Sequence, residues 1–118
     1  MTGREGPERG AVTVEAAFAS VGLVMLLAVL VSAVGVVLVQ IQCVDAAAAI
    51  ARQAARGDRA GVAQAELQLP RGGRVALRTT SSAVTVRVEA RAAIAPLGAL
   101  TIALSAESTA ALEPGGRP

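Results

Sequence analysis

The chain of 118 residues has room for one membrane-spanning helix and one small domain, and its composition excludes several kinds of site. It has no histidine and a single cysteine, Cys43, so it can form neither an intramolecular disulfide nor a Cys/His zinc site. Its net charge is only +2 and its one aromatic residue is Phe18, which argues against a basic, aromatic-lined surface for nucleic acid.

Groups suited to catalysis are sparse. The chain lacks a histidine base and contains no glycine-rich phosphate-binding motif. The carboxylates that could form an acid–base pair are scattered along the chain: Asp58, Glu66, Glu89, Glu107 and Glu113. We therefore expect a protein that is not an enzyme, holds no cofactor or metal ion, and binds no nucleic acid and no small-molecule substrate. Its expected function is interaction with partners.

The first ten residues, MTGREGPERG, are polar and rich in glycine, and we expect them to be a disordered leader in the precursor. Arginines lie on both sides of the apolar stretch that follows, so the positive-inside rule does not fix the orientation of the chain. We place the N-terminus in the cytoplasm, because a short leader needs no translocation whereas the tail is patterned as a folded domain.

Residues 11–39 are predicted to form a transmembrane helix. From residue 16 to residue 39 the chain has no charged residue and no proline. A helix over that run rises about 36 Å, and the hydrocarbon core of a bilayer is about 30 Å thick. Glu15 is the one acidic residue near the start, and a carboxylate costs about 3 kcal/mol at mid-bilayer and less near the interface.

Glu15 lies four residues after Ala11, so the two share a helix face. Cleavage between Gly10 and Ala11 would create an α-amino group that could neutralise this carboxylate, or the carboxylate of a neighbouring copy. Further along, small residues recur at a spacing of four, which lets helices approach closely, although an alanine-rich sequence contains such pairs by chance. These candidate packing residues are Ala16, Ser20, Ala28 and Ser32.

The run ERGAVTVEAAF, residues 8–18, resembles the processing site of type IV pilin-like proteins. Such proteins have a short polar leader that ends in glycine, a glutamate at the fifth residue after the cut, and a long apolar helix. With the alanine-rich run CVDAAAAIARQAARGD and a small β-rich tail, the chain resembles the TadE-like minor pilins of tight-adherence pilus systems, in the short form found in actinobacteria.

This resemblance implies cleavage between Gly10 and Ala11 by a prepilin peptidase, with Glu15 setting the register of assembly. The implied partners are the membrane, other pilins including a small major pilin, and an inner-membrane assembly platform with a cytoplasmic ATPase. The implied location is the cytoplasmic membrane, with a single span and the C-terminal domain outside, or an extracellular pilus. The outer domain has no disulfide and no aromatic surface, so a direct role in adhesion is in doubt.

Two other interpretations remain open. The chain could be a single-pass anchor whose outer domain binds a ligand or regulates a neighbour. It could also be a small secreted β domain, with residues 16–30 as the core of a signal peptide and Val31-Ser32-Ala33 as its cleavage motif. Against the second, the apolar run continues through residues 34–39. The mature N-terminal residue distinguishes them: Ala11 for the pilin, Met1 or Thr2 for the anchor, and Val34 for the secreted domain.

The helix is predicted to continue beyond the membrane over residues 40–57, because alanine is the strongest helix former. A small apolar stripe is expected on this extension, formed by Val44, Ala47, Ala48, Ala51 and Ala55. Gly57 is the expected C-cap. Cys43 is interpreted as a small helix residue, with a bridge between two copies or a lipid attachment as the alternatives.

Residues 58–118 are predicted to form a small α+β domain. Asp58 is the expected N-cap of a short helix over residues 59–69 that ends before Pro70. After a turn at 71–74 the apolar period changes to two, which predicts strands near 74–79 and 84–91 and a third strand that begins at 101 and ends before Pro114. The turns between these strands are expected at 80–82 and 96–98, and residues 115–118 are expected to fray.

On the second strand, Val84, Val86 and Val88 are expected to face the upper helix, while Arg87 and Glu89 face water. The predicted fold class is therefore α+β and pilin-like. It consists of a long N-terminal transmembrane helix that continues into an outer domain, a short second helix, and a three-stranded antiparallel sheet. Because the outer domain lacks aromatic residues, packing on its own helix is expected to supply much of its stability.

Overall fold

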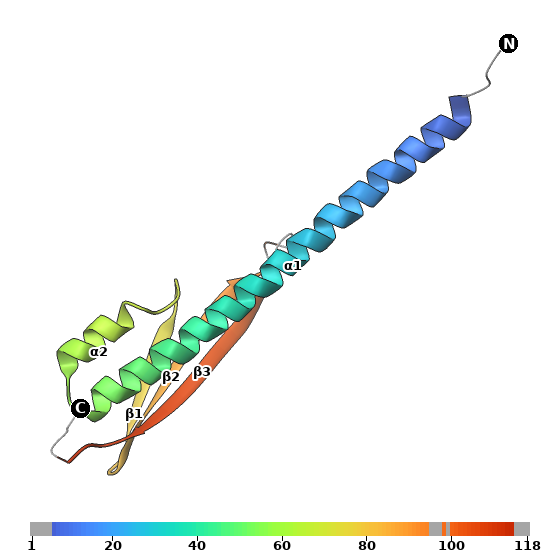
Figure 1. The fold of residues 1–118 in the computed structure, drawn as a ribbon. Coiled ribbons are helices and arrows are strands. Elements are labelled where there is room, and N and C mark those ends of the chain that lie inside the picture. Colours follow the sequence, from blue (N-terminus) through green and yellow to red (C-terminus); the bar gives the residue numbers. More distant parts are fainter. Residues whose placement is uncertain (1–5, 95–97, 99, 115–118) are drawn as a thin grey trace.

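The molecule is elongated, with extents of 95 × 19 × 18 Å, and one long helix forms its axis (Figure 1). The computed structural model describes residues 6–94, 98 and 100–114, with side chains from Arg9 onward. The long helix is α1 (Gly6–Ala55). A short helix, α2 (Arg59–Glu66), and a sheet of three strands lie against its C-terminal half. The predicted architecture of two helices and an antiparallel sheet is confirmed.

The helix α1 begins at Gly6, before the predicted start at Ala11. The expectation of a disordered leader is therefore wrong for residues 6–10, and residues 1–5 lie outside the described part of the chain. Pro7 falls in the first turn, where a missing N–H costs no hydrogen bond. Extending an existing helix is far cheaper than nucleating one, so the strongly helical segment after Gly10 can carry the helix back through the polar residues.

At its other end, α1 stops in a Schellman motif. Gly57 has a φ of 73°, the left-handed conformation that favours glycine. The N–H of Gly57 donates to the carbonyl of Ala54 at 3.0 Å, and the N–H of Asp58 donates to the carbonyl of Gln53 at 3.0 Å. These two bonds satisfy carbonyls at the helix end that would otherwise lack partners. The predicted C-cap at Gly57 is confirmed.

The predicted cap of the second helix is also confirmed, because Oδ1 of Asp58 accepts a hydrogen bond from the N–H of Gly61 at 2.9 Å. The helix ends at Glu66, earlier than the predicted Leu69. The next N–H groups bond to carbonyls three residues back, so the chain tightens into turns before it reaches Pro70.

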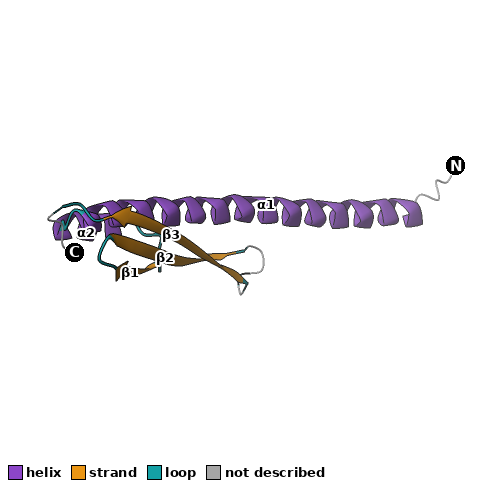
Figure 2. Cartoon of the chain, turned by 90° about the horizontal axis from the view of Figure 1, so that it is seen from below, coloured by secondary structure: helices purple, strands orange, loops and turns teal. Residues whose placement is uncertain are grey.

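The strands β1 (Arg74–Thr79), β2 (Ala83–Ala93) and β3 (Thr101–Ala111) form an antiparallel sheet in the order β1-β2-β3 (Figure 2). β2 extends beyond the predicted alternation by one residue at its start and two at its end, and β3 ends at Ala111, before Pro114 as predicted. The predicted turn at 80–82 is confirmed, and the backbone N–H of Thr80 donates to the carbonyl of Ala83 at 2.8 Å. In the predicted break at 96–98, residues 96 and 97 lie outside the described part. The predicted fraying at 115–118 also lies outside it.

The core lies between the inner face of the sheet and the C-terminal half of α1. Val84, Val86 and Val88 are fully buried on β2, whereas Arg87 and Glu89 between them are exposed, so the predicted face is confirmed. β1 places Val75 and Leu77 beside the buried valines, and β3 places Ala106 there. The short helix contributes Ala65 and Val62 to the same core.

The stripe that α1 buries differs from the predicted one by roughly a quarter of a turn. Val44 is 48 % exposed and Ala48 is only partly buried, so the prediction is wrong for both. Cys43 and Ile50 determine the buried face, because larger apolar side chains release more free energy on burial than alanine does. The buried side chains of α1 are Cys43, Ala46, Ala47, Ile50, Ala51, Ala54 and Ala55.

Candidate functional site

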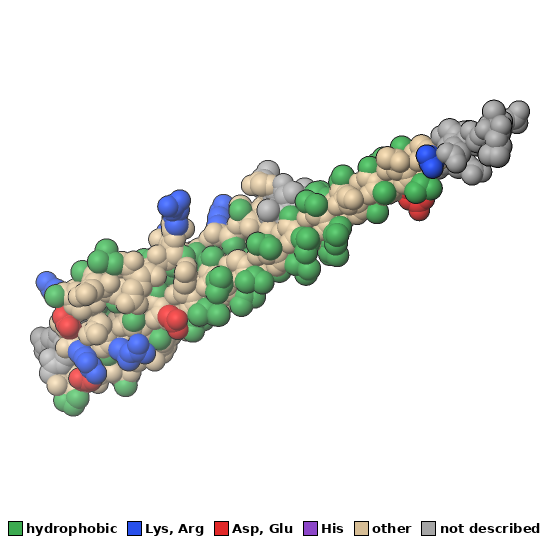
Figure 3. Space-filling view, turned by 45° about the horizontal axis from the view of Figure 1, so that its top comes forward, with side chains coloured by type: hydrophobic (Ala, Val, Ile, Leu, Met, Phe, Trp, Pro, Cys, Tyr) green, Lys and Arg blue, Asp and Glu red, His purple; other side chains and the backbone are tan. Residues whose placement is uncertain are grey.

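The N-terminal half of α1 is largely exposed and carries many large apolar side chains, and Figure 3 shows one face of it. An 18-residue window of the helix between Arg9 and Ala55 reaches a mean hydropathy of 2.9, and none of that window is buried. This exposure shows that the window is not part of a helix buried in the core of this chain. By length and composition, the helix could span a membrane, and a signal sequence would have the same properties. The large exposed residues here include Val12, Val14, Phe18, Val21, Leu23, Val24, Leu26, Leu27, Leu30, Val31 and Val34.

The predicted processing bond, between Gly10 and Ala11, lies inside the first turns of α1, and both residues are exposed. A Cβ placed on Gly10 would meet no atom within 4 Å, so the fold does not require glycine here. The carbonyl of Arg9 accepts a hydrogen bond from Oγ1 of Thr13 at 2.9 Å. A peptidase must unwind this turn to reach the bond, and a glycine makes that easier by about 1 kcal/mol relative to alanine.

Glu15 is exposed on α1 one turn beyond Ala11, and it has no hydrogen bond or ion pair within the described part of the chain. It is the only charged residue between Arg9 and Asp45. An isolated carboxylate on an apolar helix would be costly in lipid, and a positive partner from another chain or a new N-terminus would lower that cost.

The four small residues proposed for helix packing do not form one surface. Ser20 donates from Oγ to the carbonyl of Ala16, and Ser32 donates in the same way to Ala28, both at 2.8 Å. The hydroxyls are thus bonded to their own helix, which suits an apolar surrounding. The second pair lies twelve residues after the first and therefore about 120° around the helix. It is partly buried, whereas Ala16 and Ser20 are exposed.

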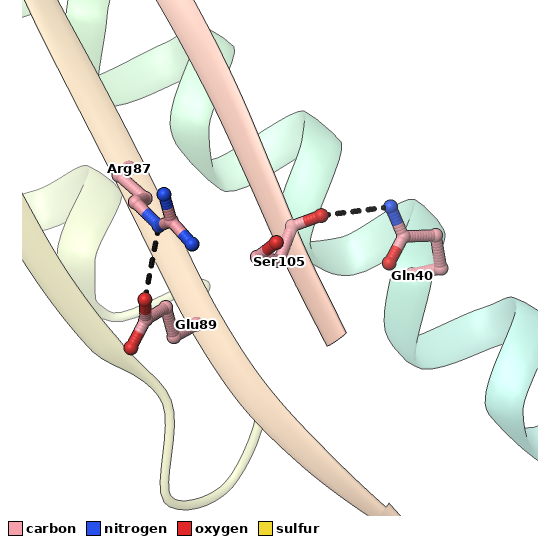
Figure 4. Close-up of polar contacts among 4 residues, drawn as sticks. All are labelled: Gln40, Arg87, Glu89 and Ser105. Carbon is pink, nitrogen blue, oxygen red and sulfur yellow. Dashed lines mark hydrogen bonds and ion pairs between the residues drawn. The ribbon is translucent and has the colours of Figure 1, made fainter. Parts of the chain in front are cut away.

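A cluster of arginines lies on the outer face of the sheet, and no pattern in the sequence predicted it. Strand alternation indicated that Arg87 and Arg91 face water, but only the antiparallel register shows that Arg74 lies beside them. An open depression of about 570 Å³ is lined by Arg71, Arg74, Arg87 and Arg91 with one acidic residue, Glu89. Glu89 accepts from Nε of Arg87 at 2.9 Å (Figure 4), which leaves the cluster with an excess of positive charge.

Cys43 is a free thiol and is fully buried where α1 passes over the sheet. Burial raises the pKa of this thiol. The interpretation of Cys43 as a small packing residue is confirmed, and the thiol is inaccessible for a bridge between copies in this conformation. Among the residues that the structure describes, no group of three potential metal ligands lies together.

No protein family, curated protein or solved structure matches this chain. Its function is therefore inferred from α1, from the residues near its N-terminus, and from the charge distribution of the sheet.

Proposed function

We propose that this chain is a minor pilin-like subunit of a tight-adherence pilus or of its assembly complex. In this proposal the chain is processed after Gly10 in the cytoplasmic membrane, and the mature protein assembles through α1 with other pilins. The processing enzyme is a prepilin peptidase. The sequence around residues 8–18 suggests this class, and the division of α1 into two halves supports it.

The observation that carries the proposal is the contrast between the two halves of α1. The C-terminal half buries one face on its own sheet, whereas the N-terminal half is largely exposed and contains, from Gly10 onward, a single charge, Glu15. A simple anchor needs only apolar residues in lipid, and a carboxylate there raises the free energy of insertion without any function in the anchor. An assembling helix can use such a carboxylate, because the charge specifies one position relative to a neighbour.

Cleavage would change the electrostatics around Glu15 in two ways. It would create an α-amino group at Ala11, one helical turn away on the same face. It would also place Glu15 near the new helix N-terminus, where the helix dipole favours negative charge. An incoming copy could then be held with its amine against Glu15 of a docked copy, which would set the axial register between subunits.

The proposal predicts that Glu15→Ala enters the membrane at least as well as the wild type but does not assemble. Removal of the carboxylate removes an insertion cost, while the amine of the neighbouring subunit loses its counter-charge. We expect co-purification with the other pilins to fall by about tenfold or more, since tenfold corresponds to only about 1.4 kcal/mol. Glu15→Asp keeps the charge and serves as the matched control. Wild-type co-purification of Glu15→Ala would favour the simple anchor.

The mature N-terminus provides an independent test. Intact-mass measurement of membrane-extracted protein should give a chain that begins at Ala11. A chain that retains residues 1–10 in a strain with an active peptidase would contradict processing. A chain that begins at Val34 would instead establish the secreted domain, because that cut removes most of the exposed half of α1 and leaves its buried half intact.

A further inference from the structure

One end of the sheet, where Ala93 of β2 pairs with Thr101 of β3, extends along α1 toward its apolar N-terminal half. We call it the β2–β3 end of the sheet. Nε2 of Gln40 donates to the carbonyl of Ser105 at 3.1 Å, which fixes these two residues at one level (Figure 4). The N–H of Glu113 donates to the carbonyl of Ala55 at 3.2 Å, so β3 runs in the same direction as α1. Thr101 therefore lies about 13 Å beyond Ser105 toward the N-terminal half of α1, at about 3.3 Å per strand residue.

The residues of α1 that are partly buried also extend toward its N-terminal half, beside this end of the sheet. Ala28, Ser32, Val36 and Val39 are partly buried and continue the face that the core covers further along, whereas small residues elsewhere in this half, such as Ala33, are exposed. At 1.5 Å of rise per residue, 13 Å corresponds to about nine helix residues, which places Thr101 level with about residue 31. Figure 2 shows this end of the sheet reaching toward the middle of α1.

Two segments that are distant in sequence, α1 and the β2–β3 hairpin, both lack charged residues at about this level. On α1 there is no charge between Glu15 and Asp45, and on the hairpin there is none between Arg91 and Glu107. The described residues at the end of the hairpin are apolar or uncharged, and Leu100 and Ile102 expose 50 % and 39 % of their surface. A hairpin that is exposed only to water would be expected to carry charged residues. The absence of charge beside the apolar half of α1 therefore fits a position close to the membrane.

Arginines lie directly above this uncharged end. Arg91 pairs with Ala103, so it lies about 7 Å above Thr101. Arg71 and Arg74 line the same open depression. The headgroup layer on each side of a bilayer is about 5–8 Å thick. If Thr101 lies at the edge of the hydrocarbon, Arg91 is at the depth of the lipid phosphates.

We propose that the β2–β3 end of the sheet inserts into the headgroup layer of the outer leaflet, with Arg91 on the phosphates of anionic phospholipids and with Arg71 and Arg74 of the same depression adding positive charge beside it. The occupant of this surface is the bilayer that α1 crosses. The proposal rests on that crossing, which is part of the proposed function, but not on processing or on pilus assembly.

Backbone pairing limits the depth of insertion. β3 is an edge strand, and β2 lacks a second partner beyond Glu89, so both expose N–H and C=O groups along their outer sides. Such groups can bond to water and lipid headgroups but are not tolerated in hydrocarbon. The two described strands therefore stay out of the hydrocarbon, and the level of Thr101 fixes the depth of α1.

This depth determines what the membrane covers. If the outer edge of the hydrocarbon lies near residue 31, a core about 30 Å thick reaches back about 20 helix residues, to about Ala11. The Gly10–Ala11 bond then lies at the inner edge, and Glu15 lies about 6 Å inside the hydrocarbon. The unpartnered carboxylate is thus held where it needs a positive neighbour.

The chain contains no tryptophan or tyrosine, so single tryptophans report on depth without background. Thr101→Trp and Ala111→Trp form a matched pair, because both residues are exposed on the outer face at opposite ends of β3. The full chain is reconstituted into vesicles of phosphatidylcholine and phosphatidylglycerol with quenchers at shallow or deep positions of the acyl chain. We expect Thr101→Trp to show blue-shifted emission, quenching by the shallow label and protection from acrylamide. Ala111→Trp should behave as in water.

Phe18→Trp, quenched by the deep label, reports whether α1 itself inserts. If Phe18→Trp is quenched and Thr101→Trp is as open to acrylamide as Ala111→Trp, the hairpin proposal is wrong and the span stands. If Phe18→Trp is not quenched by lipid either, the span and the proposed function fail together. Deep-label quenching of Thr101→Trp would overturn the proposed depth.

The arginines are tested in the Thr101→Trp chain by omitting phosphatidylglycerol. Shallow-label quenching should weaken in pure phosphatidylcholine, and Arg91→Gln should reduce this dependence on anionic lipid. Arg78→Gln is the matched control, because Arg78 pairs with Thr85 at the far end of the sheet. Equal effects of the two substitutions, or none from either, would rule out phosphate contacts by this cluster.

Discussion

Two glycines near the ends of α1 differ in what the fold requires of them. Gly57 has a φ of 73° and closes the helix, a conformation that costs other residues about 1 kcal/mol or more. Gly10 lies in regular helix with open space around its Cα. A requirement for glycine at position 10 must therefore come from a molecule outside the fold, and under the proposed function that molecule is the peptidase.

Gly57→Ala should lower the free energy of unfolding of the domain by about 1 kcal/mol, because alanine is strained in the left-handed region. Urea unfolding followed by circular dichroism in detergent micelles measures this change. Gly10→Ala is the control and should not lower the stability of the domain. Equal stability of Gly57→Ala and the wild type would contradict the role of the Schellman motif.

Gly10→Val should block processing and leave the fold unchanged, because its side chain meets no neighbour in this chain but would clash in a pocket that accepts only hydrogen. Intact-mass measurement of membrane fractions should then show the full precursor. Normal cleavage of the valine variant would exclude a glycine-specific peptidase at this bond.

At the scale of elements, β2 supplies the buried side chains of the sheet among the described residues, and it lies between the core and the solvent. Its even-numbered residues from Val84 to Ala92 are buried against α1, and its odd-numbered residues from Arg87 onward are exposed. The core consists of alanine, valine, isoleucine and cysteine, so no aromatic ring compensates for a lost contact. One buried substitution should therefore affect the whole domain.

Val86→Asp should unfold the domain, since an unpaired buried charge costs several kcal/mol and the domain is small. Arg87→Asp, on the adjacent exposed position, removes the ion pair with Glu89 and faces Glu107 across the sheet. Its cost should be about 1 kcal/mol or less, because these groups are solvated. Limited proteolysis compares the two variants, and equal sensitivity would contradict the assigned face of β2.

At the scale of the whole molecule, one thiol reports whether the sheet is docked on α1. Cys43 is fully buried near the point where the apolar half of α1 meets the core, and burial raises the pKa of its thiol. Since the thiolate is the reactive form, both effects slow alkylation at neutral pH.

We expect iodoacetamide to modify Cys43 slowly in the full native chain and rapidly after urea is added. Val86→Asp should make modification fast without urea, and Arg87→Asp should leave it slow. Mass spectrometry of the alkylated chain gives the rate. Fast modification of the native chain would show that the sheet leaves α1 readily.

Local patterns in the sequence determined much of this protein. The uncharged run after Glu15, the alanine-rich extension, the cap residues Asp58 and Gly57, and the two-residue period of β2 each determined an element, because each acts through neighbours within a few residues. The same patterns placed Gly10, Ala11 and Glu15 on one exposed segment.

Only the tertiary structure decided which face of α1 is buried, where the hairpin ends along it, and which arginines lie together. The buried face depends on packing against Val84, Val86 and Val88, and alanines all around the helix could not specify it. The level of Thr101 depends on a bond between Gln40 and Ser105, which are 65 residues apart. Arg74 and Arg91 lie near each other because the antiparallel register pairs Arg74 of β1 with Glu89 of β2, two residues from Arg91, a pairing between strands that no local pattern encodes.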